Sequence, residues 1–252
     1  MSLDQSTVLQ WAGNGSTWVP VGTEASALFA GDAGVFATNP ATGDIYRYDG
    51  TPGRWTPAGS AGAQFATGGR DLYALTPRRD AVMRYDSPGH WTLIGGPALD
   101  IYAGGAGLFA TRPGDGHLMR YLGREQQWER IGNPGLQFAV GPRDIYGLNS
   151  DGVFHWTGQG DGWHRIGPTA VSIHAGGAGL FAVDAVDAAD RIRRFNGTGT
   201  WTDIGQRGTA LIADNTHLYR LAADRQSLSL WNGNGDSWTQ IGGPSSAIAS
   251  TG

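Results

Sequence analysis

The sequence contains no cysteine, which excludes disulfide bonds and thiolate metal sites. It also contains no lysine, so all 18 basic residues are arginine, a usage that suggests a GC-rich, bacterial coding sequence. With 22 acidic residues, the formal net charge is −4. Proteins that bind nucleic acid usually carry a basic surplus, and we therefore expect no nucleic-acid partner.

Long apolar runs are missing as well. None approaches the roughly 18 residues that a membrane-spanning helix needs, so we expect no membrane span. Residues Met1 to Asp4 show neither the basic nor the apolar region of a signal peptide. A chain without cysteine fits the cytosol and equally a secreted protein without disulfides, and both localisations stay open.

Glycine is abundant, with 42 residues spread along the chain, which indicates many turns. One motif, W-x-x-[IVA]-G, recurs seven times along the chain at spacings of 35 to 38 residues. Such even spacing is typical of a repeat architecture. The copies are Trp18–Gly22, Trp55–Gly59, Trp91–Gly95, Trp128–Gly132, Trp163–Gly167, Trp201–Gly205 and Trp238–Gly242.

A second aromatic residue precedes each motif by six or seven positions. Together the two positions hold all ten tryptophans of the chain, so we expect each tryptophan to belong to the scaffold. The second aromatics are Trp11, Tyr48, Tyr85, Tyr121, Trp156, Phe195 and Trp231.

Each repeat contains four short strand-like segments. Residues 99–132 read "LDIYAGG", "GLFATRP", "GHLMRYLG" and "QWERIG", separated by Gly-rich turns. No segment carries a useful helical period. Four-stranded units repeated around an axis make a β-propeller. We predict an all-β fold: a single-domain, seven-bladed β-propeller over residues 1–252, with short four-stranded blades of about 36–37 residues each.

Ring closure accounts for the two ends of the chain. Residues 6–22 supply the third and fourth strands of a blade, and residues 245–251 align with a first strand. We predict that the closing blade is shared between the termini and lacks its second strand, or that the chain is excised from a longer protein. The units also alternate between an "AGGAGLFA" and a "GPRDIYGL" type, with about 73 residues per pair.

The segments "GDIYRYDG" and "AGGAGLFAT", together with the W-x-x-I-G anchor, resemble tectonin repeats and, at a greater distance, the tachylectin-type propeller lectins. This resemblance covers essentially the whole chain. It implies recognition of carbohydrate or surface glycans by a multivalent ring. The second strand departs from the pattern, since it reads "LFAT" or "LYAL" where tectonins favour V-W-G-V-N, and no sugar-contact residue carries over.

One candidate ligand-binding position directly precedes the second aromatic. In one interpretation the arginine stem lies between blades and its guanidinium caps carbonyl groups or a neighbouring carboxylate. In the other it clamps an anionic or polyhydroxylated ligand. The position holds Arg47, Arg84, Arg120, His155 and Arg194.

A second candidate lies in the turn before the second strand of alternate units, at Arg70-Asp71 and Arg143-Asp144. The aspartates either cap local backbone N–H groups or hold sugar hydroxyls at the rim of a pocket.

No motif predicts a catalytic residue, a metal site or a cofactor. We expect a binding protein whose repeated inter-blade pockets take glycans or another small polar ligand. One alternative is a lyase, hydrolase or cyclase with a single active site in the central channel. The other is a protein-interaction platform. The sequence leaves the ligand and the oligomeric state open.

Overall fold

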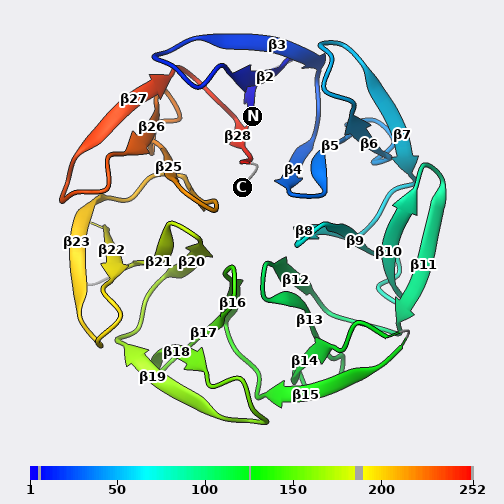
Figure 1. Ribbon diagram of the computed structural model, residues 1–252, viewed down its shortest axis with the longest axis vertical. Coiled ribbons are helices and arrows are strands. Elements are labelled where there is room, and N and C mark those ends of the chain that lie inside the picture. Colours follow the sequence, from blue (N-terminus) through cyan, green and yellow to red (C-terminus); the bar gives the residue numbers. More distant parts are fainter. Residues whose placement is uncertain (5–6, 125, 185–189, 251–252) are drawn as a thin grey trace.

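The computed structural model describes residues 1–4, 7–124, 126–184 and 190–250. Within these residues, 28 strands pair into seven four-stranded antiparallel sheets. The sheets stand around a central axis as the blades of a propeller (Figure 1). The described part of the chain holds no helix, and hence none long and apolar enough to cross a membrane.

We number the complete blades in chain order and letter their strands A to D from the axis outwards. Blade 1 holds β4 (Ala27–Gly31), β5 (Gly34–Thr38), β6 (Ile45–Tyr48) and β7 (Trp55–Gly59); blade 2 holds β8 (Gln64–Gly68), β9 (Asp71–Leu75), β10 (Val82–Ser87) and β11 (His90–Gly95); blade 3 holds β12 (Ile101–Gly104), β13 (Gly107–Thr111), β14 (Leu118–Tyr121) and β15 (Trp128–Gly132). Blade 4 holds β16 (Gln137–Val140), β17 (Ile145–Asn149), β18 (Gly152–Trp156) and β19 (Trp163–Gly167); blade 5 holds β20 (Ser172–Gly176), β21 (Gly179–Val183), β22 (Arg191–Phe195) and β23 (Trp201–Gln206); blade 6 holds β24 (Ala210–Ala213), β25 (Leu218–Leu221), β26 (Leu228–Trp231) and β27 (Trp238–Gly242).

The closing blade corrects the prediction of a missing second strand. Its order is β28 (Ala247–Ile248), β1 (Ser2–Asp4), β2 (Thr7–Trp11) and β3 (Trp18–Thr23). Strand β1 pairs with β28 on one side and with β2 on the other, so this blade also has four strands. A three-residue strand is too short to show an alternating pattern, which is why the sequence did not reveal it.

A belt of tryptophan side chains joins each blade to the one before it. The indole N–H of Trp55 donates to the carbonyl oxygen of Val21 in the preceding blade at 2.8 Å. A Cβ on Gly22 would lie 2.7 Å from the Trp55 nitrogen, which explains why each W-x-x-[IVA]-G motif ends in glycine. The same bond recurs at every blade junction, as Trp18–Ile241, Trp55–Val21, Trp91–Ala58, Trp128–Ile94, Trp163–Ile131, Trp201–Ile166 and Trp238–Ile204.

The remaining tryptophans support the turn between strands C and D. The indole N–H of Trp156 donates to the Gly160 carbonyl at 2.8 Å, and Trp11 and Trp231 make the equivalent bonds in their blades. All ten tryptophans are therefore tied to the backbone, as the prediction of a scaffold role requires.

The two alternating blade types make two kinds of junction. At the junctions of blades 1 and 2 and of blades 3 and 4, aromatic rings of the A strands pair edge to face. The ring centroids of Phe29 and Phe65 are 5.5 Å apart, and those of Tyr102 and Phe138 are 5.4 Å apart.

The junctions of blades 2 and 3 and of blades 4 and 5 use a glutamine clamp instead. The side-chain amide of Gln137 donates to the Ile173 carbonyl and accepts from the Ile173 N–H, at 2.9 and 2.8 Å. Gln64 makes the same pair of bonds with Ile101 of blade 3. These clamps satisfy backbone groups that the innermost strand would otherwise leave unpaired.

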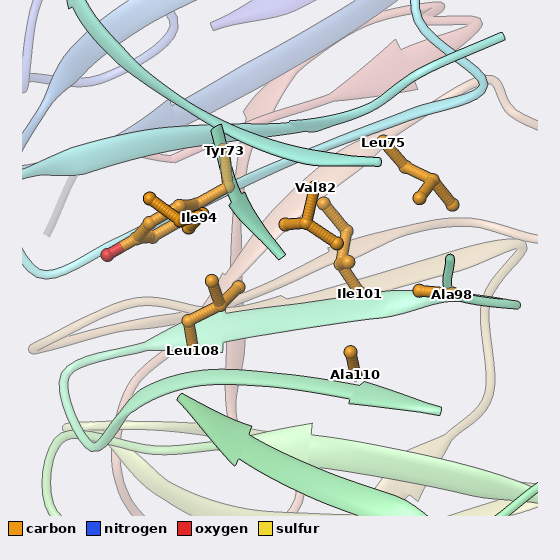
Figure 2. Close-up of a cluster of buried hydrophobic side chains, with 8 residues drawn as sticks. All are labelled: Tyr73, Leu75, Val82, Ile94, Ala98, Ile101, Leu108 and Ala110. Atoms are coloured by element: carbon orange, nitrogen blue, oxygen red, sulfur yellow. The ribbon is translucent and has the colours of Figure 1, made fainter. Parts of the chain in front are cut away.

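The hydrophobic core lies between the blades. At the junction of blades 2 and 3, Tyr73, Leu75, Val82 and Ile94 face residues of blade 3 (Figure 2). The opposing side chains are Ala98, Ile101, Leu108 and Ala110. Burying a leucine or isoleucine of this kind contributes about 1.5–3 kcal/mol. Similar clusters lie between the other neighbouring blades from the closing blade round to blade 6.

Candidate functional site: pockets between the blades

Two of the arginines that precede the strand C aromatics, Arg120 and Arg194, lie at blade junctions. The Arg120 guanidinium is 5.3 Å from the ring centroid of Trp156 in the next blade. Arg194 lies in the same way over Trp231, at 5.5 Å. These cation–π contacts tie neighbouring blades together, so Arg120 and Arg194 have a structural role.

The other members of this series differ in their contacts. Arg84 donates two hydrogen bonds to Asp86 of its own strand, at 3.3 and 3.2 Å. Arg47 is exposed. His155 lies 2.8 Å from the Asp144 carboxylate, and its ring stacks on Tyr146 at a centroid distance of 5.1 Å.

The predicted Arg-Asp turn residues contact the predicted position before the strand C aromatic at one place, in blade 4. Asp144 pairs with His155. Burial, together with the charge of the same Asp144, raises the pKa of Tyr146 to about 12. Asp71 accepts a hydrogen bond from the Tyr73 hydroxyl at 3.1 Å. Arg70 and Arg143 are exposed, and neither takes part in an ion pair within the described ranges. The nine predicted residues therefore do not form one pocket.

Two pockets open instead on the opposite face of strand C. Each lies between the strand D end of one blade and the B–C connection of the next. The first, the Trp55 pocket, has a volume of about 610 Å³ between the closing blade and blade 1, and its lining includes Pro20, Glu24, Asn39, Tyr46 and Trp55. The second, the Trp163 pocket, has about 200 Å³ between blades 3 and 4, and its lining includes Asn133, Asn149, Phe154, Asp161 and Trp163.

The two pockets are equivalent by position in the repeat. Tyr46 and Phe154 occupy the same place in strand C, and Asn39 and Asn149 the same place at the end of strand B. The Oδ1 atom of Asn39 accepts the N–H groups of Ala41 and Thr42, and that of Asn149 likewise accepts two N–H groups of its own turn. This leaves each amide nitrogen as the donor for a ligand.

Sequence reasoning missed these residues although a signal existed. Blades 1 and 4 carry an aromatic residue just before the Arg47 and His155 positions, whereas blades 2 and 3 carry Met83 and Met119 there. The aromatic position and the asparagine coincide in the two blades where the pockets open.

Side chains of the protein itself occupy the corresponding space in two other blades. In blade 5, Arg193 replaces the aromatic residue and its Nε lies 2.5 Å from the Asp184 carboxylate. In blade 6, the Arg220 guanidinium covers the Trp238 ring at 4.3 Å.

The central channel has few polar side chains that could contact a ligand. Its cavity of about 370 Å³ lies at the A–B turns and is lined chiefly by glycine and alanine, with Asp32 and Asp214 as its carboxylates. Asp214 is already bonded to the N–H groups of Thr216 and His217. Among the described residues, no cluster of three or more His, Asp or Glu side chains could hold a metal ion.

Comparisons with solved structures show what fold this chain has. YCF48 bound to D1 peptide is 12% identical, with 95% of this chain and 87% of that chain covered and a TM-score of 0.56. The CRINKLY WD40 ectodomain of the Arabidopsis thaliana receptor kinase ACR4 is 14% identical, with 89% and 82% covered and a TM-score of 0.55. Virginiamycin B lyase from Staphylococcus aureus is 13% identical, with 96% and 89% covered and a TM-score of 0.58.

At these identities the likeness shows the β-propeller fold alone. The three neighbours are a propeller with a bound peptide, a receptor ectodomain and a lyase, and none is a tectonin or a tachylectin. No family model and no curated protein matches the sequence. The resemblance to the propeller lectins therefore stays a prediction.

Proposed function

We propose that this propeller is a carbohydrate-binding protein that takes one sugar in the Trp55 pocket and one in the Trp163 pocket. The observation that carries the proposal is the shared pair of an aromatic ring and an asparagine amide in the two open pockets. Aromatic rings stack on the apolar faces of sugars, and an amide nitrogen donates to a hydroxyl.

Two sites on one ring suit a surface that bears many copies of a ligand. Each shallow pocket would bind weakly by itself, and the second binding event would be intramolecular, which raises the avidity. The predicted positions at Arg47, Arg84, Arg120 and Arg194 lie outside these pockets, so the sugar contacts proposed here are Asn39, Tyr46, Asn149 and Phe154.

Isothermal titration with a sugar identified on a glycan array tests the proposal. We expect two sites per chain, and we expect Tyr46→Ala and Phe154→Ala each to remove one of them. Met119→Ala changes the same strand position in blade 3, between the Trp55 and Trp163 pockets in the ring, and should leave both sites intact. Binding that survives the double variant Tyr46→Ala/Phe154→Ala would refute the proposal.

A second candidate function, protein binding, is favoured by a different surface. Leu99, Leu136 and Val171 hold the same position in three consecutive blades, one or two residues before the innermost strands. Their side chains are 43%, 75% and 43% exposed. Adjacent exposed apolar side chains on one face are typical of an interaction site.

Peptides selected for binding to the wild-type protein would test this candidate. If the three side chains form the contact, Leu136→Asp should weaken the selected peptides at least tenfold, whereas Tyr46→Ala should not. Peptides that bind both variants as well as the wild type would argue against it.

A further inference from the structure

One blade junction contains a natural occupant of the pocket. Trp55, Trp163 and Trp238 hold the same position in blades 1, 4 and 6. At Trp238 the space above the ring is taken by Arg220, whose guanidinium lies 4.3 Å from the ring centroid. Its Nη1 donates to the Gln206 carbonyl of the preceding blade at 2.9 Å.

The surroundings of Arg220 favour a cation. Burial lowers the pKa of Arg220, and the nearby Asp236 carboxylate opposes that effect. An aromatic face, a backbone carbonyl and a carboxylate together make a site for a guanidinium or an ammonium group.

The Trp55 pocket has the same parts without the arginine. Ala37 stands at the position of Arg220 and Thr23 at that of Gln206, and both line the pocket. Glu24 supplies a carboxylate, and within the described part of the chain it takes part in no ion pair. The space above Trp55 is therefore open, and the carboxylate of Glu24 gives the pocket a negative charge.

The Trp163 pocket differs in charge. There Arg130 pairs with Asp161 and donates to the Asn133 side chain at 2.8 Å, so the carboxylate is already neutralised. Pro20 stands at the position of Arg130 in the Trp55 pocket and brings no charge.

We propose that the Trp55 pocket binds a cationic group, and that the sugar it takes carries a free ammonium in place of a hydroxyl or an acetamide. The ammonium lies over Trp55 as Arg220 lies over Trp238, with Glu24 as its counter-ion. This inference rests on the carbohydrate-binding function proposed above and assigns the class of sugar to one of its two pockets. The Trp163 pocket takes neutral sugars.

Isothermal titration of the full chain with three matched tetrasaccharides tests the inference. The probes are a β-1,4-linked glucosamine tetramer, its fully N-acetylated counterpart and a glucose tetramer, measured at pH 6 so that the amines are charged. We expect one site per chain at which the glucosamine tetramer binds at least tenfold more tightly than either neutral probe.

Two variants locate that site. Glu24→Gln should remove the preference for the amine, whereas Glu129→Gln, an exposed carboxylate of blade 3, should not change it. Ala37→Arg should place an internal cation over Trp55 and abolish the site. Should Ala37→Arg fail to fold, Glu24→Gln still decides the matter.

The possible results separate the two proposals. If neutral and amino sugars bind the Trp55 pocket equally well, the cation inference fails and the carbohydrate function stands. If no sugar binds but arginine amide binds and is lost in Glu24→Gln, the cation site stands without the carbohydrate function. If neither the sugars nor arginine amide bind, both proposals fail.

Discussion

The closing blade and the junction of blades 2 and 3 show how unevenly this ring is built. Blades 2 and 3 meet through a cluster of eight buried side chains. The cluster on the closing blade has two, Val8 and Val21. Two of the closing strands, β1 and β28, have three and two residues. A cavity of about 150 Å³ lies beside this blade, lined by Trp11 and Ile212 among others, and the Trp55 pocket lies on its other side.

From this difference we expect the ring to be weakest where the two termini meet. Junctions 2/3 and 4/5 have glutamine clamps, but the residue at the corresponding position of blade 6 is Ala210. The closing blade is held by its tryptophan bonds, from Trp18 to Ile241 and from Trp55 to Val21, and by hydrogen bonds between Arg225 and the segment that leads to β28. We expect local opening to begin there.

Acid should weaken a second junction, the one between blades 5 and 6, so that the closing blade is no longer the only weak place. His174 takes the position that Phe29 and Tyr102 hold in blades 1 and 3, and burial lowers its pKa from 6.5 to about 4. The unfolded chain therefore binds the proton first. Stability is fully present above about pH 6.5 and is lost as the pH falls through about 4, by up to about 3 kcal/mol.

Urea unfolding between pH 7 and pH 4 measures this loss. His174→Phe places there the residue type that blade 1 has at this position, and it should reduce the pH dependence of the free energy of unfolding. A pH profile that is the same in the variant and the wild type would show that His174 is not its source.

A glycine substitution should separate a tight junction from the closing one. A Cβ on Gly59 would lie 2.5 Å from the Trp91 nitrogen, whereas a Cβ on Gly242 would lie 3.1 Å from the Trp18 nitrogen. Since overpacking typically costs 1–3 kcal/mol, we expect Gly59→Ala to lower the free energy of unfolding by about 2 kcal/mol. Gly242→Ala should cost clearly less, and equal losses in urea denaturation would contradict the packing difference.

Removing a glutamine clamp from one junction and adding one to the closing junction should change their stabilities in opposite directions. Gln137→Ala leaves the N–H and carbonyl of Ile173 without their partners, which we expect to cost about 2 kcal/mol. The reverse change, Ala210→Gln, offers the missing clamp to the closing blade and should stabilise by at most about 1 kcal/mol. Thermal unfolding of both variants measures the two effects, and destabilisation by Ala210→Gln would mean that the closing blade has no room for the clamp.

The sequence predicted the scaffold well because the scaffold is periodic. Seven copies of one motif, with a glycine that must admit the next indole, recur at nearly constant spacing. The alternation of blade types also has a visible counterpart, since Gln64 and Gln137 lie in the even-numbered blades. Strand β1 was not predicted because three residues are too few to show the alternation of a strand.

The candidate site was harder to predict because it depends on departures from the repeat. Repetition drew attention to Arg120 and Arg194, which hold blades together. A pocket opens where Ala37 or Gly147 leaves space that Arg220 fills in blade 6. Whether a small residue leaves a cavity is decided by its neighbours in the next blade, which lie about a repeat away in the chain.

The tryptophan belt also determines what an opened ring would do. The indole and the carbonyl of each bond belong to different blades, so no blade contains a complete bond. A ring that parts between blade 6 and the closing blade exposes Trp18 at one end and the Ile241 carbonyl at the other. These ends are complementary but not alike, so two opened copies would join head to tail, in the heterologous manner that yields either closed dimers or growing chains.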